Sequence, residues 1–115
     1  MIATDVANRH SDSNNLTKET ALTETGAVVN GRGDTPNQHD ILTGSNADGT
    51  LAVGQTCGDW TLNGEGAAIV GHSDRVGIDD SAAMKSWNSS HASRGCSQDN
   101  SVGTGGAGLL YCFAK

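Results

Sequence analysis

The chain has few of the residues that build a large hydrophobic core. Among its 115 residues it has two tryptophans, one tyrosine and one phenylalanine, and its hydrophobic fraction is 35%. Glycine alone contributes 16 residues. Burial is marginal for one domain of this size unless the core is good, so we predict a loop-rich chain that needs covalent links or a neighbouring chain to hold one structure.

Two further absences exclude partners. No run approaches the eighteen or so apolar residues of a membrane span, so we predict no membrane insertion. The chain has 13 acidic against 7 basic residues, a net charge of -6 and no basic cluster. A surface that binds nucleic acid or anionic lipid needs clustered positive charge, and we therefore expect neither partner.

The N-terminus has no apolar signal core, whereas the three cysteines argue for an oxidising compartment, where disulfides form and persist. We therefore predict an extracellular or periplasmic location. We also expect either that Met1 is not the natural start or that a signal and more of the domain lie upstream. Low hydrophobicity with net negative charge favours disorder, and residues 1–21 are expected to be extended or flexible.

The most chemically mixed segment is Gly71-His72-Ser73-Asp74-Arg75. A catalytic triad needs a base held between a nucleophile and an orienting group, and side chains adjacent in sequence rarely point at one another. The flanks of Ser73 also lack a nucleophile elbow. We predict no enzymatic activity and a structural polar cluster in which Asp74 pairs with Arg75 and His72 packs beside Trp87, with a metal or ligand role as the alternative.

Spacing does not single out a metal site. The chain has neither a Cys-x-x-Cys nor a His-x-x-x-His pattern, the spacings that mark many zinc sites. We assign no metal ligands and no required cofactor, and keep calcium and zinc as alternatives.

The second half of the chain carries a family resemblance. Cys57-Gly58-Asp59-Trp60 is followed by Trp87, by Cys96 in a Gly/Ser loop, and by a short apolar run, residues 105–113, that contains Cys112. This pattern resembles the C-type-lectin fold, in the variant found in the endostatin module of collagens and in bacterial extracellular proteins. The resemblance implies an α+β, loop-rich fold with a mixed sheet, long loops and little helix, spanning residues 22–115 as the C-terminal half of the family's module.

Local patterns add two structural expectations. Residues 57–61 are expected to form a strand, with a bulge at Gly58 that lets Cys57 and Trp60 both reach the core. The run that contains Cys112 is expected to be a buried closing strand.

The resemblance also implies a disulfide pairing. In the family's pattern Cys57 pairs with Cys96, and Cys112 pairs with an upstream cysteine that this chain does not have. Cys112 is then either a buried free thiol or is bonded to a cysteine outside this chain, and we predict the latter. Metal ligation by cysteine and histidine is a further alternative.

The family's metal sites have incomplete counterparts. The Glu-Pro-Asn of sugar-binding C-type lectins corresponds to Thr35-Pro36-Asn37, and their Trp-Asn-Asp to Trp87-Asn88-Ser89, so both carboxylates are missing. Calcium prefers six to eight oxygen ligands that include carboxylates. The histidines that hold zinc near the start of endostatin have no match here.

We predict a non-catalytic extracellular binding or structural module that presents Gly/Asn/Asp-rich loops to a protein partner or second chain. Loops on a rigid scaffold are where recognition usually resides. The alternative is a lectin-like module that binds carbohydrate or metal. The candidate ligand-binding residues are Asn37, His39, His72, Asp74, Trp87, Asn88 and His91.

Overall fold

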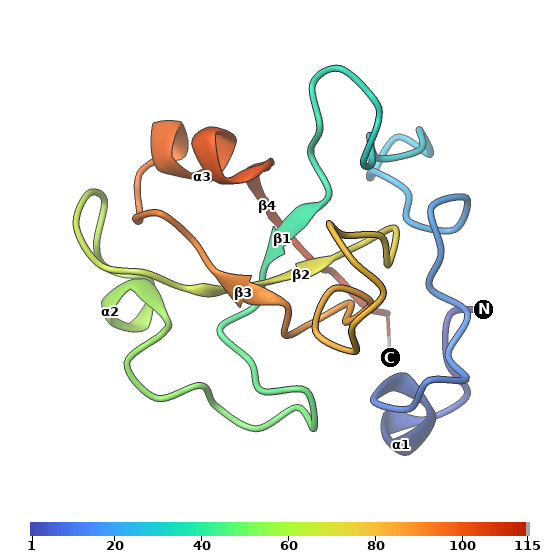
Figure 1. Ribbon diagram of the computed structural model, residues 1–115. Coiled ribbons are helices and arrows are strands. Elements are labelled where there is room, and N and C mark those ends of the chain that lie inside the picture. The colour runs from blue at the N-terminus through green and yellow to red at the C-terminus, as the bar shows by residue number, and fades with distance from the viewer. Residues whose placement is uncertain (115) are drawn as a thin grey trace.

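A four-stranded mixed sheet forms the centre of the computed structural model, which describes residues 1–114 (Figure 1). The strand order is β3-β2-β1-β4. β2 pairs antiparallel with both β1 and β3, whereas β4 pairs parallel with β1. The predicted α+β, loop-rich architecture with a mixed sheet is confirmed. The strands are β1 (Asp40–Leu42), β2 (Ile69–His72), β3 (His91–Ala92) and β4 (Gly106–Leu110).

Three short helical segments flank the sheet: α1 (Val6–Arg9), α2 (Cys57–Trp60) and α3 (Gln98–Thr104). Asp5 caps α1, and a capping box between Ser97 and Asn100 begins α3. Both caps satisfy backbone N–H groups that a helix start leaves unpaired. Within residues 1–114 no helix has the length and apolar character needed to cross a bilayer.

The segment around Cys57 is not the strand that we predicted. Residues 57–60 form a left-handed turn, because Cys57, Gly58, Asp59 and Trp60 all have positive φ angles of 50–66°. The Thr56 hydroxyl accepts a hydrogen bond from the Asp59 N–H at 3.0 Å and closes this turn. The bulge at Gly58 is therefore wrong, and Trp60 is half-exposed rather than packed in the core.

The predicted disulfide between Cys57 and Cys96 is confirmed and joins α2 to the segment before α3. The interpretation of Cys112 as a buried free thiol is wrong. The residue lies beyond the end of β4 and is exposed. β4 is an edge strand and is only partly buried. A disulfide from Cys112 to another chain stays a prediction.

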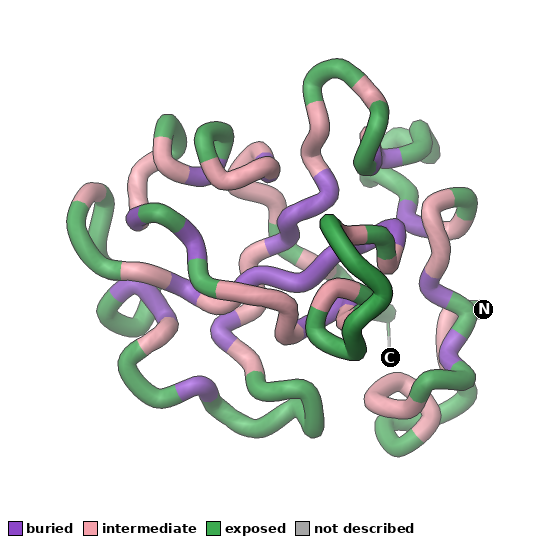
Figure 2. The backbone as a smooth tube through the Cα atoms, viewed as in Figure 1, coloured by how far each residue is buried: buried purple, intermediate pink, exposed green. Residues whose placement is uncertain are grey.

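The apolar core is small, and Figure 2 shows buried stretches of backbone along the central strands. Ile41, Ala68 and Val70 are buried on and beside the central strands. A second cluster joins Leu16 and Ala21 to Trp87, with Ile2 and Tyr111 packed against it. Residues before position 22 thus contribute side chains to the core; the domain boundary that we placed there, and the flexibility of residues 1–21, stay predictions.

Candidate metal centre

Three neighbouring strands bring three histidines and one aspartate to the same end of the sheet. Asp40 begins β1 and lies opposite His72, the last residue of β2. His91 begins β3 and lies opposite Val70, two residues before His72. Because side chains alternate between faces with a period of two, Asp40, His72 and His91 project from the same face. His39 directly precedes β1, and its carbonyl accepts a hydrogen bond from the Ser73 N–H at 2.9 Å.

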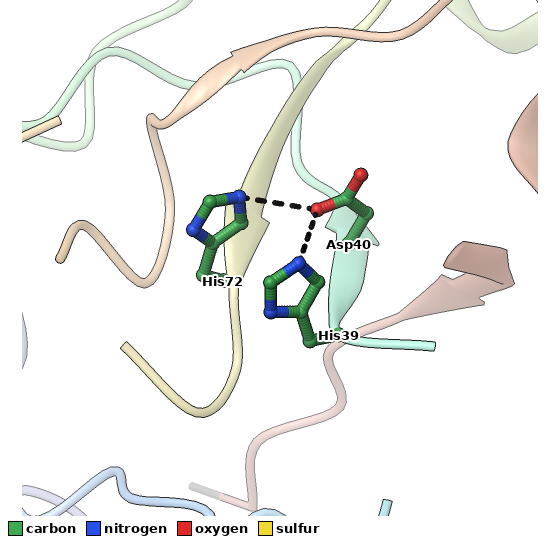
Figure 3. A group of neighbouring side chains, drawn as sticks. All are labelled: His39, Asp40 and His72. Carbon is green, nitrogen blue, oxygen red and sulfur yellow. Dashed lines mark ion pairs between the residues drawn. The ribbon is translucent and has the colours of Figure 1, made fainter. Parts of the chain in front are cut away.

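All three imidazoles direct Nε2 at one carboxylate oxygen, and Figure 3 shows two of them. The distances to Asp40 Oδ1 are 3.4 Å from His39, 3.2 Å from His72 and 3.6 Å from His91. His72 Nε2 and His91 Nε2 are 3.1 Å apart. The rings of His39 and His72 are stacked, with centroids 4.2 Å apart. The ligand-type atoms of His39, Asp40 and His72 all lie within 4.8 Å of one another, and His91 Nε2 lies beside His72 and Asp40.

Asp40 is buried beside the three imidazoles and away from lysine and arginine. Its side chain is 2% exposed, yet neither carboxylate oxygen has a hydrogen-bond partner among the described residues. No lysine or arginine of residues 1–114 lies within ion-pair distance of it. An isolated buried carboxylate is strongly unfavourable unless it is paired or coordinates a metal. The groups of residues 1–114 within ion-pair distance of Asp40 are the three imidazoles, so Asp40 is stabilised either by a protonated histidine or by a bound cation.

The second nitrogen of each ring is hydrogen-bonded to an oxygen. His72 Nδ1–H donates to the Met84 carbonyl at 2.8 Å, and His91 Nδ1–H to the Ala92 carbonyl at 3.1 Å. His39 Nδ1 lies 2.8 Å from Asp74 Oδ1. Since a carbonyl only accepts, Nδ1 of His72 and of His91 carries a proton, and Nε2 of each ring is the atom that lies toward Asp40. This is how metal-ligating histidines are oriented in proteins.

The electrostatics of the cluster follow from its burial and contacts. Burial alone would lower the pKa of His72, but the Asp40 carboxylate and the Met84 carbonyl outweigh it and raise that pKa above its ordinary value. Burial would raise the pKa of Asp74, but hydrogen bonds from His39, Arg32 and Val76 lower it to about 2. Asp74 is therefore a fixed negative charge behind His39.

The structure brings together four of the candidate residues, His39, His72, Asp74 and His91, but not with the partners that we predicted. Asp74 does not pair with Arg75; it accepts from His39, and the Arg75 guanidinium instead donates to Asn14. His72 stacks on His39 rather than packing beside Trp87. The predicted polar cluster exists, but the pairing within it was wrong because residues adjacent in sequence diverge at the end of β2.

The other candidates have different side-chain partners. Trp87 is buried against Tyr111, with ring centroids 5.3 Å apart. The buried Asn88 amide donates to the carbonyls of Asn46 and Ala47. The Asn37 side chain accepts a hydrogen bond from the His39 N–H at 3.3 Å and so supports the segment that carries that histidine.

Sequence reasoning missed Asp40. The available signal was its position: His39-Asp40 directly precedes the apolar pair Ile41-Leu42, and His72 directly follows a small-residue apolar strand. Antiparallel pairing of those two segments brings the start of one beside the end of the other. The sequence does not show that these two segments pair as strands, however, so nothing in it connected Asp40 with His72.

Comparison with known proteins adds no assignment: no family model, no curated protein and no solved structure matches this chain.

Proposed function

We propose that this chain is a metal-binding module that holds one zinc ion between His39, Asp40, His72 and His91. The observation that carries the proposal is the spacing of the ligand atoms. Zinc lies about 2.0–2.2 Å from nitrogen and oxygen ligands in a tetrahedron, whose edges are then about 3.3–3.6 Å. Four of the six distances between these ligand atoms are 3.1 to 3.6 Å and are close to such edges, and the ligand atoms of His39, Asp40 and His72 all lie within 4.8 Å of one another.

The ligand types favour zinc over calcium. Three imidazoles and one carboxylate form a nitrogen-rich set that suits zinc, copper or nickel, whereas calcium takes six to eight oxygens. Four protein ligands close a tetrahedral ion, which is the arrangement of structural rather than catalytic zinc. This supports a non-catalytic role, as the sequence predicted.

Charge balance also supports the ion. A divalent cation is neutralised by the Asp40 carboxylate together with Asp74, which contacts the back of His39. The site then buries no net charge. Without the ion, two buried carboxylates face histidines whose protonation has to supply the positive charge, a less favourable arrangement at neutral pH.

A zinc titration of the chelator-treated protein, monitored by isothermal titration calorimetry, tests the proposal. We expect one ion per chain. His91→Ala removes the ligand that is most exposed, at 36%, and is expected to weaken zinc binding beyond the roughly 10–100-fold that losing a hydrogen-bond partner behind a ligand costs.

His10→Gln is the matched control, because His10 is the one histidine of the chain outside the cluster and lies beside Trp87. Its zinc affinity is expected to equal that of the unaltered chain. Equal weakening by both substitutions, or no binding by the unaltered chain, contradicts the proposal.

Carbohydrate binding is the second candidate, because one cavity gathers all the aromatic residues of the chain. A cavity of about 340 Å³ is lined by Trp60, Trp87, Tyr111 and Phe113, together with the polar side chains of Thr43, Ser45 and Asn88. Trp60 is half-exposed at its rim. Aromatic faces with a few polar groups are a common composition for a small-molecule site.

A titration with galactose and with N-acetylglucosamine, monitored by tryptophan fluorescence, tests this second candidate. We expect a saturable change in the unaltered chain that Trp60→Ala abolishes. An unchanged spectrum of the unaltered chain excludes these sugars as ligands of the cavity.

The family resemblance and the extracellular or periplasmic location are also proposals. The mixed sheet and the Cys57–Cys96 disulfide are compatible with the C-type-lectin-like, endostatin-like fold and with an extracellular or periplasmic location. The exposed Cys112 lines an apolar cavity of about 670 Å³ with Leu109 and Phe113, which supports a protein partner or second chain bonded there. The intact mass of natively isolated protein before and after reduction tests that bond.

A further inference from the structure

We infer that the metal ion controls the conformation of two surface loops, residues 31–36 and 75–85, through hydrogen bonds on the far side of its histidine ligands. The inference rests on the proposed zinc site. The ion then has a regulatory role, because fixing the orientation of the histidine rings also fixes the loop segments that are hydrogen-bonded to them.

Asp74 connects His39 to both loops. Its Oδ1 accepts from His39 Nδ1 at 2.8 Å and from the Val76 N–H at 3.1 Å, and its Oδ2 accepts from the Arg32 N–H at 2.7 Å. Gly31 allows this approach, since a Cβ at that position would collide with Asp74 Oδ2. One carboxylate thus joins a zinc ligand to the first loop and to the start of the second.

His72 holds both ends of the second loop. Its Nδ1–H donates to the Met84 carbonyl at 2.8 Å, and its backbone N–H donates to the Ser86 carbonyl at 2.9 Å. At the other end, the Arg75 N–H donates to the His72 carbonyl at 3.0 Å.

Two other side-chain contacts join these loops to the N-terminal segment: the Lys18–Asp34 ion pair and the hydrogen bond from the Arg75 guanidinium to Asn14. Residues 78–83 are exposed, as are Arg32, Gly33, Thr35 and Pro36, and residues 31–36 belong to the loop that rises above β1 in Figure 1. Segments with few buried contacts open most readily. The attachments that run through an imidazole are those of His39 to Asp74 and of His72 to the Met84 carbonyl, and these two require the ring orientation and tautomer that zinc coordination through Nε2 imposes.

Limited trypsin digestion of the intact, disulfide-bonded chain tests the inference, because the basic residues fall at informative places. Arg32 lies in the first loop, Arg75 and Lys85 bound the second, and Arg9 in α1 is a control away from the cluster. Mass spectrometry follows each cleavage in zinc and in chelator. We expect zinc to slow cleavage after Arg32, Arg75 and Lys85 by about 10-fold or more, while cleavage after Arg9 is unchanged.

Asp74→Asn separates the two attachments. An amide accepts through only one of its two terminal atoms, so it cannot replace both carboxylate oxygens. We expect zinc still to bind, about 10–100-fold more weakly, and at saturating zinc to protect the bond after Lys85 but no longer the bonds after Arg32 and Arg75.

The possible failures are distinguishable. Zinc binding with equal protection at all four bonds, or with protection at none, overturns the loop inference and leaves the metal site standing. Absence of zinc binding in calorimetry overturns the metal site, and the loop inference with it.

Discussion

Replacing Asp40 with asparagine is expected to abolish stabilisation by zinc while leaving the metal-free protein as stable as before, or more so. A ligand at 100-fold excess over its Kd stabilises a protein by about 2.7 kcal/mol, which for a domain of this size raises Tm by about 10 °C. The unaltered chain should show that shift. The Asp40→Asn variant should show none, because the amide supplies no negative charge to the ion. Thermal unfolding in zinc and in chelator, both at pH 8, measures the difference.

The metal-free half of this prediction separates two explanations of the cluster. In the zinc account Asp40 serves mainly the ion, because neither carboxylate oxygen has a hydrogen-bond partner within residues 1–114 and burying an unpaired charge is costly. If Asp40 instead holds the histidines directly as an ion pair, the substitution destabilises the chelator-treated protein as much as the zinc-treated one. That result would contradict a metal site.

Removing the disulfide with the paired substitution Cys57→Ser and Cys96→Ser is expected to cost about 4 kcal/mol of unfolding free energy. The bridge closes a loop with a sequence separation of 39 residues, and the chain-entropy model gives this magnitude for such a loop. The core is small, so the loss is a large fraction of the 5–15 kcal/mol typical of a domain. Urea denaturation of both proteins measures it.

Cys112→Ser is the control for the disulfide, since Cys112 is exposed and forms no disulfide within residues 1–114. As an isolated monomer, the Cys112→Ser chain is expected to be as stable as the unaltered monomer. A loss under 1 kcal/mol for the paired substitution would mean that the sheet and the metal site, rather than the bridge, hold this part of the chain.

The outcome for the cysteines shows which inferences a sequence supports. The Cys57–Cys96 pair was predicted correctly from the resemblance, which supplied a connectivity that cysteine spacing alone leaves open. The resemblance did not give the conformation of the turn around Cys57, in which four consecutive residues adopt positive φ. Trp60 is a bulky residue that rarely adopts such a φ, and nothing local predicts it.

Helix α3 was missed although its signals are local. Ser97 and Asn100 form the capping box, and Gly105 follows the last helical residue with φ of 128°. The segment Gln98–Thr104 has almost no apolar periodicity, which is the signal on which helix prediction mainly rests. The capping residues alone, without an apolar helix face, were therefore not enough to predict this helix.

The members of the histidine cluster were predicted in part, but their arrangement was not. His39, His72, Asp74 and His91 were candidates by residue type, but the arrangement depends on strand register, which places Asp40 opposite His72 and His91 two residues away. Register is a long-range property that the pairing of this short sheet determines. Only the folded chain shows that three imidazoles share one carboxylate.

X-ray absorption spectroscopy at the zinc edge, on protein loaded with one ion per chain, tests the central claim most directly. The account predicts four nitrogen and oxygen ligands at about 2.0–2.1 Å, with the outer-sphere scattering of three imidazoles and no sulfur. A sulfur ligand at about 2.3 Å, which would implicate Cys112, or a shell of six light atoms typical of a hydrated surface ion, would contradict it.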